Sequence, residues 1–341
     1  MNQFFRLFIS CSIINLSLGL FLPYSASAQQ QNAAPPMPAL SPLNHTVDNH
    51  VIHVLPKTPI RQARAAMATK NPGPLLYAKG GSVMNDVTIY AIYWAPPKLQ
   101  NGAPALMSSA YQALQTQLIS DYPGHGLANN NTQYYQNING AISYISSQGR
   151  FGGSYIDTSP YPNSKCKAST TPNTCITDAD IAAKAQEVAA LQGWPSGMNS
   201  LFMIYTSKGE DVCDDSSASS QCANTDYCGY HSYTDQTSPT LIYAIMPYGD
   251  PVGCGGAKTP NNNPAAEAAM NTASHEITEA ITDPLIDAWA TADGEEIADI
   301  CGGFGAFTWK SGTANQMWNG HFYALQQEYN NHTKSCVSIG P

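Results

Sequence analysis

The segment from Ala273 to Pro284 contains acidic and imidazole side chains at the spacing of a helical metal site. His275 and Glu279 are four residues apart, so on a helix their side chains lie on one face, one turn apart. Two side chains so placed can bind one metal ion, and Glu276 can then take a proton from a water molecule, as in the zinc-protease motif His-Glu-x-x-His. Glu279 stands where that motif has its second histidine. We therefore expect a divalent metal at His275 and Glu279, with Glu276 as the general base.

A metal hydrolase also needs a third protein ligand and an open position for water. Asp299 lies 24 residues after His275, and Glu296 precedes it by three, so both could face the site if that segment is helical. This resembles the zincin plan, in which a downstream acid completes the coordination. We favour Asp299 as the metal ligand, with Glu296 beside it or exchanging that role; the alternative is that both are surface acids. Zinc tolerates such a set of two carboxylates and one imidazole, and manganese or calcium also becomes credible.

His231, in the segment Cys228–Tyr233, is the best further candidate for a catalytic residue. It could be a ligand or could stabilise an oxyanion, and a structural histidine beside a disulfide is an equal alternative. The sequence has no Gly-x-Ser-x-Gly elbow and no phosphate-binding glycine loop before a helix. Glu276 and Glu279 share one helix and cannot flank a sugar from opposite sides, which argues against a glycosidase.

The helix that carries the motif has clear start and stop signals. Asn263 is suited to the N-cap and Pro264 to the first helical position, while Pro284 disfavours helix just before it. Its core-facing residues are predicted to be Met270, Ala273, Ile277, Ala280 and Ile281. Further helices are predicted over 107–122 and 178–194, the second with Ile181, Ala185, Val188 and Leu191 inward. Strands are predicted over 83–94, 201–205 and 241–246.

This mixture predicts a single α+β domain over residues 73–341, with a mixed sheet, an active-site helix and disulfide-rich loops. Residues 29–72 read as a leader, a linker or a prosegment, with an ordered patch at 51–55. His45, His50 and His53 lie close together there. An inhibitory prosegment whose histidine caps a metal is one interpretation, and a solvated tail is the favoured one.

The first 28 residues have the pattern of a signal peptide: a basic start, a short apolar run and the small residues Ala26-Ser27-Ala28. Of the nine cysteines, Cys11 leaves with this segment, and the remaining eight predict up to four disulfides in an exported protein. Cys166–Cys175 and Cys301–Cys336 are the favoured pairs. The net charge of −9 and the lack of a basic run argue against nucleic acid as a partner. We expect a secreted monomer, extracellular or periplasmic, without membrane association after cleavage.

Several segments resemble the EXORDIUM, or phosphate-induced, family of secreted proteins, over about residues 75 to 337. The resemblance rests on Gly80–Met84, Cys228–His231, Ser274–Glu279, Asp283–Trp289 and Glu296–Cys301. Ser274, Asp283 and Asp287 depart from the plant pattern, which argues that positions 283 and 287 are not essential to a shared metal site. The resemblance implies a secreted, zincin-like domain, here of a microbial member. It does not imply a particular substrate.

Together these observations predict a secreted metal-dependent hydrolase, first of all a peptidase that acts on proteins or peptides. His275, Glu279 and Asp299 would hold Zn²⁺ or another divalent cation, and an edge strand, 241–246 or 201–205, would align the substrate. The alternative is a non-enzymatic extracellular signalling or binding protein of the EXORDIUM type, whose metal is structural or absent.

Overall fold

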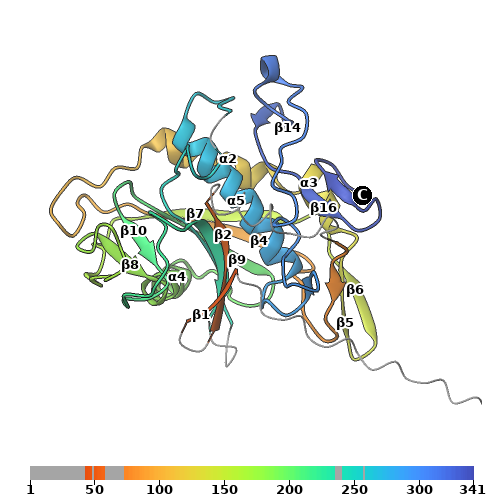
Figure 1. Cartoon of the computed structure of the whole chain (residues 1–341), viewed down its shortest axis with the longest axis horizontal. Helices are drawn as coiled ribbons and strands as arrows, with labels where there is room; N and C mark the ends of the chain where they lie inside the picture. The colour runs from red at the N-terminus through yellow and green to blue at the C-terminus, as the bar shows by residue number, and fades with distance from the viewer. Residues whose placement is uncertain (1–42, 48–49, 58–72, 235–239, 256–257) are drawn as a thin grey trace, which may run out of the picture. The chain divides into compact units, whose positions relative to one another are not determined.

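A seven-stranded mixed sheet organises the chain (Figure 1). The computed structural model describes residues 43–47, 50–57, 73–234, 240–255 and 258–341, all within the unit Pro36–Pro341. Neighbouring strands are parallel from β12 to β7 and antiparallel from β1 to β12. Their spatial order is β1 (Asn44–Val47), β2 (His50–Pro56), β11 (Tyr227–Tyr233), β12 (Ile242–Met246), β9 (Ser200–Thr206), β4 (Thr88–Trp94) and β7 (Arg150–Asp157).

The predicted strands are present, but one of their expected roles is wrong. Residues 201–205 and 241–246 form β9 and β12, and the second half of 83–94 forms β4. We expected β9 or β12 to be an edge strand that aligns a substrate. Both are interior strands, because β12 lies between β11 and β9, and β9 lies between β12 and β4. Their backbone groups are already paired on both sides, so neither can accept an added strand.

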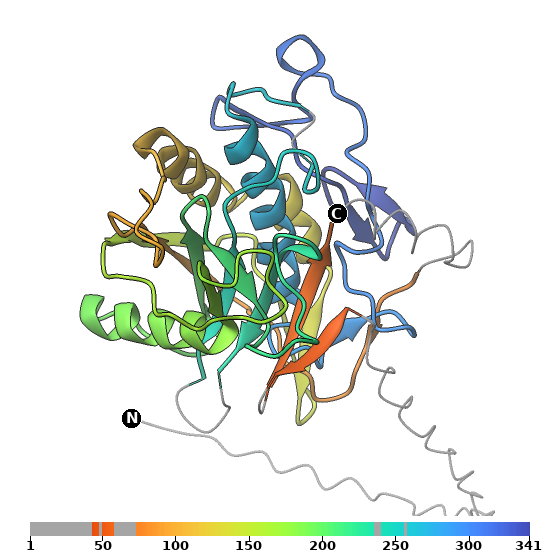
Figure 2. The same ribbon diagram turned by 60° about the vertical axis from the view of Figure 1, so that its left-hand side comes forward.

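Helices cover both faces of the sheet (Figure 2). On one face, Ile89, Ala91 and Tyr93 of β4 join a core with α2, α3 and α5. On the other face, Tyr90, Ile92 and Trp94 pack with α4. The alternation follows from the two-residue period of a strand, which sends successive side chains to opposite faces. The helical segments of the described residues are α2 (Ser109–Asp121), α3 (Gly126–Asn131), α4 (Asp178–Gln192), α5 (Pro264–Thr282) and the 3₁₀ turn η1 (Lys310–Gly312).

The helix α5 begins and ends as its sequence signals predict. The Asn263 side chain accepts a hydrogen bond from the backbone N–H of Ala266, and Pro264 takes the first helical position. In α4, Ile181, Ala185 and Val188 are buried as predicted, but Leu191 is 63% exposed. Ala189 continues the buried stripe instead, because residues 185, 188 and 189 have the i, i+3, i+4 spacing of one helical face.

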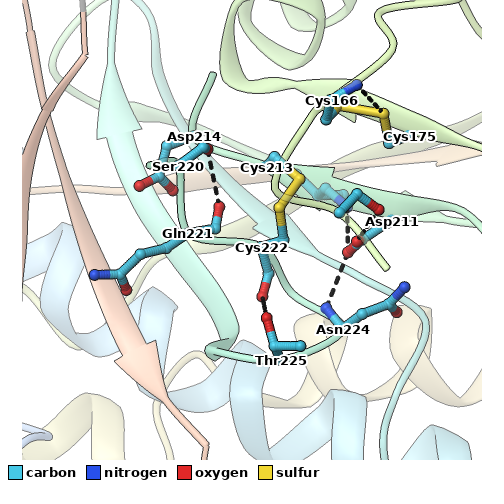
Figure 3. Close-up of a disulfide and its surroundings, with 12 residues drawn as sticks. Cys166, Cys175, Asp211, Cys213, Asp214, Ser220, Gln221, Cys222, Asn224 and Thr225 are labelled. Atoms are coloured by element: carbon cyan, nitrogen blue, oxygen red, sulfur yellow. Dashed lines mark hydrogen bonds between the residues drawn. A yellow bond between two sulfur atoms is a disulfide. The ribbon is translucent and has the colours of Figure 1, made fainter. Parts of the chain in front are cut away.

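Four disulfides hold the loops outside the sheet, namely Cys166–Cys175, Cys213–Cys222, Cys228–Cys254 and Cys301–Cys336. The first and the last are the pairs that the sequence favoured. Figure 3 shows the first two beside the small parallel sheet of β8 and β10. The paired short strands are β3 (Leu76–Tyr77) with β13 (Trp289–Ala290), β5 (Tyr135–Ile138) with β6 (Ala141–Tyr144), β8 (Cys175–Thr177) with β10 (Asp211–Cys213), β14 (Gln316–Trp318) with β15 (His321–Tyr323), and β16 (Glu328–Asn330) with β17 (Ser335–Val337).

Two N-terminal strands that precede residue 73, where the sequence suggested a domain boundary, are part of the same sheet as the rest of the domain. Both β1 and β2 belong to the main sheet, and β2 pairs with β11 next to the sheet's interior. The predicted signal peptide, residues 1–28, and the remainder of the leader at 29–42, 48–49 and 58–72 lie outside the described residues. Among the described helices, none is both long and apolar enough to cross a bilayer.

Glu210, in the turn after β9, makes the stability of the fold depend on pH. Its Oε1 accepts a hydrogen bond from Gln100 Nε2 at 2.6 Å, and burial raises the pKa of its carboxyl from 4.5 to about 8. A raised carboxyl pKa means that the folded state holds its proton more tightly than the unfolded state. The resulting stabilisation is complete below pH 4.5 and is lost as the pH rises through about 8.

We therefore expect Glu210→Gln to raise the melting temperature at pH 9 relative to wild type and to leave it unchanged at pH 4. Thermal unfolding followed by circular dichroism measures both. Asp293→Asn, which neutralises an exposed acid, is the matched control and should show no such difference. Equal melting temperatures of Glu210→Gln and wild type at pH 9 would contradict the raised pKa of the buried Glu210 carboxyl.

Candidate metal centre

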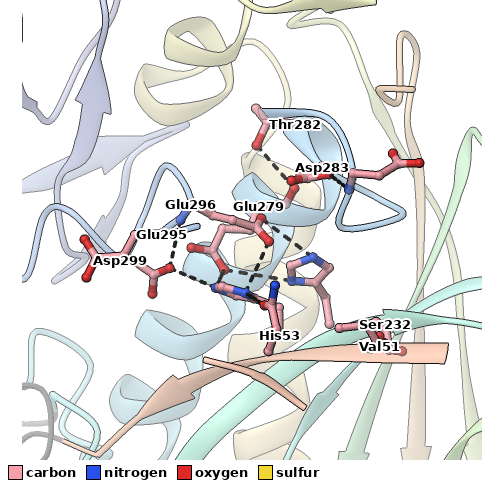
Figure 4. A network of polar contacts seen from close by, with 12 residues as sticks. Val51, His53, Ser232, Glu279, Thr282, Asp283, Glu295, Glu296 and Asp299 are labelled. Carbon is pink, nitrogen blue, oxygen red and sulfur yellow. Dashed lines mark hydrogen bonds and ion pairs between the residues drawn. The ribbon is translucent and has the colours of Figure 1, made fainter. Parts of the chain in front are cut away.

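Three imidazoles and four carboxylates converge beside the C-terminal half of α5. Figure 4 labels four of them, His53, Glu279, Glu296 and Asp299. The seven come from four separate elements: α5, the turn after β13, and strands β11 and β2. Each of the seven side chains is at most 4% exposed. The residues are His275, Glu276 and Glu279 of α5, Glu296 and Asp299 of the turn, His231 of β11 and His53 of β2.

The helix α5 presents the motif as its spacing predicts. His275 Nε2 lies 3.0 Å from Glu279 Oε2, so the two side chains share one face. Glu276 points toward β11, where His231 Nδ1 lies 3.4 Å from its Oε2. Gly229 permits this close approach of β11 to α5, because a Cβ there would come within 2.6 Å of Thr272 Cγ2 and 2.7 Å of the Ile245 carbonyl oxygen.

Glu296 and Asp299 lie in a turn, whereas we expected a helix to direct both side chains toward the site. Both acids reach the centre nevertheless, because the backbone N–H of Glu296 donates to Asp299 Oδ2 at 2.9 Å and holds the turn tight. Asp299 Oδ1 lies 3.8 Å from His275 Nε2. The Cys301–Cys336 disulfide then fixes the end of the turn to the C-terminal strands. Tertiary contacts therefore supply what the expected helix would have supplied.

His53 is the residue that the favoured sequence interpretation left outside the centre. We favoured a solvated tail for the three N-terminal histidines, but His53 is fully buried, with Nε2 2.8 Å from Asp299 Oδ2 and 3.9 Å from Glu279 Oε2. His45 and His50 pair elsewhere, with Asp214 at 2.8 Å and Asp178 at 2.6 Å. The available signal was the strand pattern around it: Ile52 and Val54 face one core, so the residue between them faces the other side.

The charges of the centre are costly without a cation. Burial, together with the charges of neighbouring acids, raises the pKa values of Glu276, Glu279 and Glu296 well above the usual range. Burial also raises the pKa of Asp299, but the charge and hydrogen bond of His53 outweigh it, so the net shift is downward. Burial and the nearby His53 lower the pKa of His231, which favours its neutral form. Such a set of groups is stable when protons or a metal ion balance the carboxylates.

The donor atoms fit a divalent cation. Two groups satisfy the distances for a shared ion, one of His53, Glu279 and Asp299 and one of His231, Glu279 and Glu296, each with its ligand atoms within 4.8 Å of one another. Neither carboxylate oxygen of the buried Glu296 accepts a hydrogen bond, and its nearest imidazole nitrogens are 3.3 Å and 3.8 Å away. Ligands about 2.0–2.1 Å from zinc in a tetrahedron lie about 3.3 Å apart, which is close to the separations found here.

Gln326, which the sequence did not single out, contacts the outer side of His275. Its Nε2 lies 2.9 Å from His275 Nδ1 and 2.8 Å from the Ala298 carbonyl oxygen, and its backbone N–H donates to Asn271 Oδ1. Because the amide nitrogen also donates to the Ala298 carbonyl oxygen, its orientation is fixed, and it holds the ring of His275 in place from the outer side. An outer partner of this kind fixes the orientation of a metal ligand.

No family model, no curated protein and no solved structure matches the chain. Its function therefore has to be argued from the site.

We expect Gln326→Met to lower zinc affinity by about 10–100-fold, because the ring of His275 loses its outer hydrogen-bond partner while the volume of the side chain is kept. Competition with a chromophoric chelator measures the affinity. Gln327→Met, at the neighbouring, partly exposed position, is the matched control and should bind zinc as wild type does. Unchanged affinity in a folded Gln326→Met protein would show that Gln326 does not support the centre.

Proposed function

We propose that this protein is a secreted, zincin-like metal-dependent hydrolase whose substrates are proteins or peptides. One observation carries the proposal: His275 Nε2 lies within 3.8 Å of carboxylate oxygens of both Glu279 and Asp299, with Glu276 adjacent on α5. These three residues would hold Zn²⁺ or another divalent cation, with Glu296 beside them. Buried imidazole and carboxylate donors at these separations are a set that zinc uses.

Glu276 would be the general base of the reaction. A divalent cation at the centre would lower the pKa of a water molecule and polarise the peptide carbonyl. Glu276 takes the proton from the attacking water as the oxygen–carbon bond forms, and passes it to the amide nitrogen as the carbon–nitrogen bond breaks. A carboxylate adjacent to the attacking water can accept the proton and return it in this way.

His231 would assist next to Glu276. Its Nδ1 lies 3.4 Å from Glu276 Oε2, and its lowered pKa favours a neutral ring with one N–H. A neutral ring can donate a hydrogen bond to Glu276 or to the oxyanion that develops on the carbonyl.

The strand beside the centre supports an extended substrate. β11 carries His231 and already pairs along its outer side with an extended segment of this chain, β2. A peptide in the same conformation could make the same main-chain hydrogen bonds, which is how strand addition binds peptides. The four disulfides support export to an oxidising compartment.

Burial of the centre favours a second function. Every one of its side chains is 4% exposed or less, and closed sites with four protein ligands are the structural type of zinc site. Under this alternative the protein is a non-enzymatic signalling or binding protein of the EXORDIUM type. Removal of the metal would then lower its melting temperature, and no variant would turn over peptide.

We expect the purified protein to contain about one equivalent of metal, His275→Ala to lose it, and Glu276→Gln to keep it. Glu276→Gln should lower peptide turnover by about 10²–10⁴-fold, because the amide cannot accept the water proton. Elemental mass spectrometry gives the metal content. Mixed-sequence fluorogenic peptides, offered before and after limited proteolysis, give turnover.

Glu267→Gln is the matched control, because Glu267 is a buried acid on the same helix with its hydrogen bond to the backbone of Asn261. It should leave metal content and turnover unchanged. Turnover by Glu276→Gln at the control's rate would eliminate Glu276 as the base, and absence of metal from the wild-type protein would eliminate the proposal.

A further inference from the structure

Strands β1 and β2 bring a fourth donor to the proposed centre from a region of sequence far from the motif. We propose that His53 is a metal ligand that fills the position a reacting water needs, so that the β1–β2 pair keeps the enzyme closed until it leaves β11. This inference rests on the proposed function and concerns the regulation of the same site.

The geometry of His53 is that of a ligand. Its Nε2 lies 2.8 Å from Asp299 Oδ2 and 3.9 Å from Glu279 Oε2. His275 Nε2 approaches the same two acids, at 3.0 Å from Glu279 Oε2 and 3.8 Å from Asp299 Oδ1. Two imidazoles thus alternate with two carboxylates at separations that bracket the value of about 3.3 Å for a zinc tetrahedron. Two carboxylates also match the charge of one divalent cation.

The same strand pair orients the ring of His53. Asn44 of β1 lies directly opposite His53 of β2, and its Oδ1 is hydrogen-bonded to His53 Nδ1 at 2.5 Å. Because an amide oxygen only accepts, Nδ1 donates to Asn44, and Nε2, which donates to Asp299 in this structure, is the nitrogen that would bind a metal in place of its proton. Metal-binding histidines are held by this kind of outer hydrogen bond. The ligand and its support therefore enter and leave the centre together.

The strand β2 occupies the place proposed for substrate. It runs antiparallel to β11, with His53 opposite His231 and Val54 opposite Tyr230. Figure 4 shows His53 projecting from this strand toward Glu279 and Asp299. A peptide that paired with β11 would need the same backbone groups, so substrate and β2 exclude each other.

Contacts away from the centre hold the strand pair in place. His45 and His50 pair with Asp214 and Asp178, and Lys57 Nζ lies 2.9 Å from Asp250 Oδ2. These pairs flank the metal centre without contributing to it. They explain why the closed arrangement persists without a covalent link between β2 and β11, and why it can be opened without breaking the sheet from β11 to β7.

Cobalt substitution tests the inference on the full-length chain. Cobalt-loaded wild-type protein should show the intense visible bands of a four-coordinate centre and little change on addition of acetohydroxamate, which needs a free position. His53→Ala should show weaker bands and bind acetohydroxamate at least about tenfold more tightly, a difference of about 1.4 kcal/mol. Peptide turnover should rise in the same variant. His53→Gln repeats the test if His53→Ala does not fold.

His50→Gln is the matched control, because His50 lies on the same strand and contacts Asp178 outside the centre. It should behave as wild type does. One equivalent of cobalt with equal acetohydroxamate affinity in wild type and His53→Ala would overturn closure by His53 and leave the proposed function standing. Absence of bound cobalt, or an opened centre without turnover, would overturn the proposed function and this inference with it.

Discussion

The burial of four carboxylates around three imidazoles is the constraint on which the rest of the structure depends. Water cannot solvate Glu276, Glu279, Glu296 and Asp299, since none is more than 4% exposed. Burying an isolated charge in such surroundings costs too much desolvation free energy, and ion pairs with the imidazoles offset only part of that cost. A cation shared by these acids would satisfy them together, and this is the physical reason for proposing a metal at the centre.

The fold holds the four acids together and prevents their side chains from reaching solvent. α5 is buried along almost its whole length between the sheet and its neighbouring helices, so the side chains of its last turns cannot rotate into solvent. The 295–301 turn is held by the Cys301–Cys336 disulfide and by the backbone bond from Tyr329 to the Ile297 carbonyl. Gly229 lets β11 lie close against the helix. Rigid support of this kind is what a preorganised site needs.

The N-terminal strands β1 and β2 determine how many side chains could bind a metal at the site. With β2 beside β11, His53 lies close to Glu279 and Asp299 and would be a fourth protein donor to the proposed metal; without β2, the proposed donors would be His275, Glu279 and Asp299 alone. The two functions proposed above, a hydrolase and a structural metal protein, would thus differ by the position of one strand pair. The two functional readings are therefore two states of one arrangement as much as two alternatives.

The sequence alone determined the local parts of this protein. Cap and stop residues at Asn263 and Pro284 set the bounds of α5, and the four-residue spacing set the pairing of His275 with Glu279. These features depend on near neighbours in the chain, which is why periodicity reveals them. Apolar runs also gave β9 and β12, although their interior places in the sheet did not follow.

Only the tertiary structure decided which distant residues join the motif. His53 is more than 200 residues from α5, and its role depends on the register of β2 against β11, where a shift of one residue would turn it to the opposite face. Gln326 and the direction of Glu296 likewise depend on packing between remote segments. Composition and spacing carry no information on such long-range register, because the free energy that selects it comes from contacts that exist only after the chain has folded.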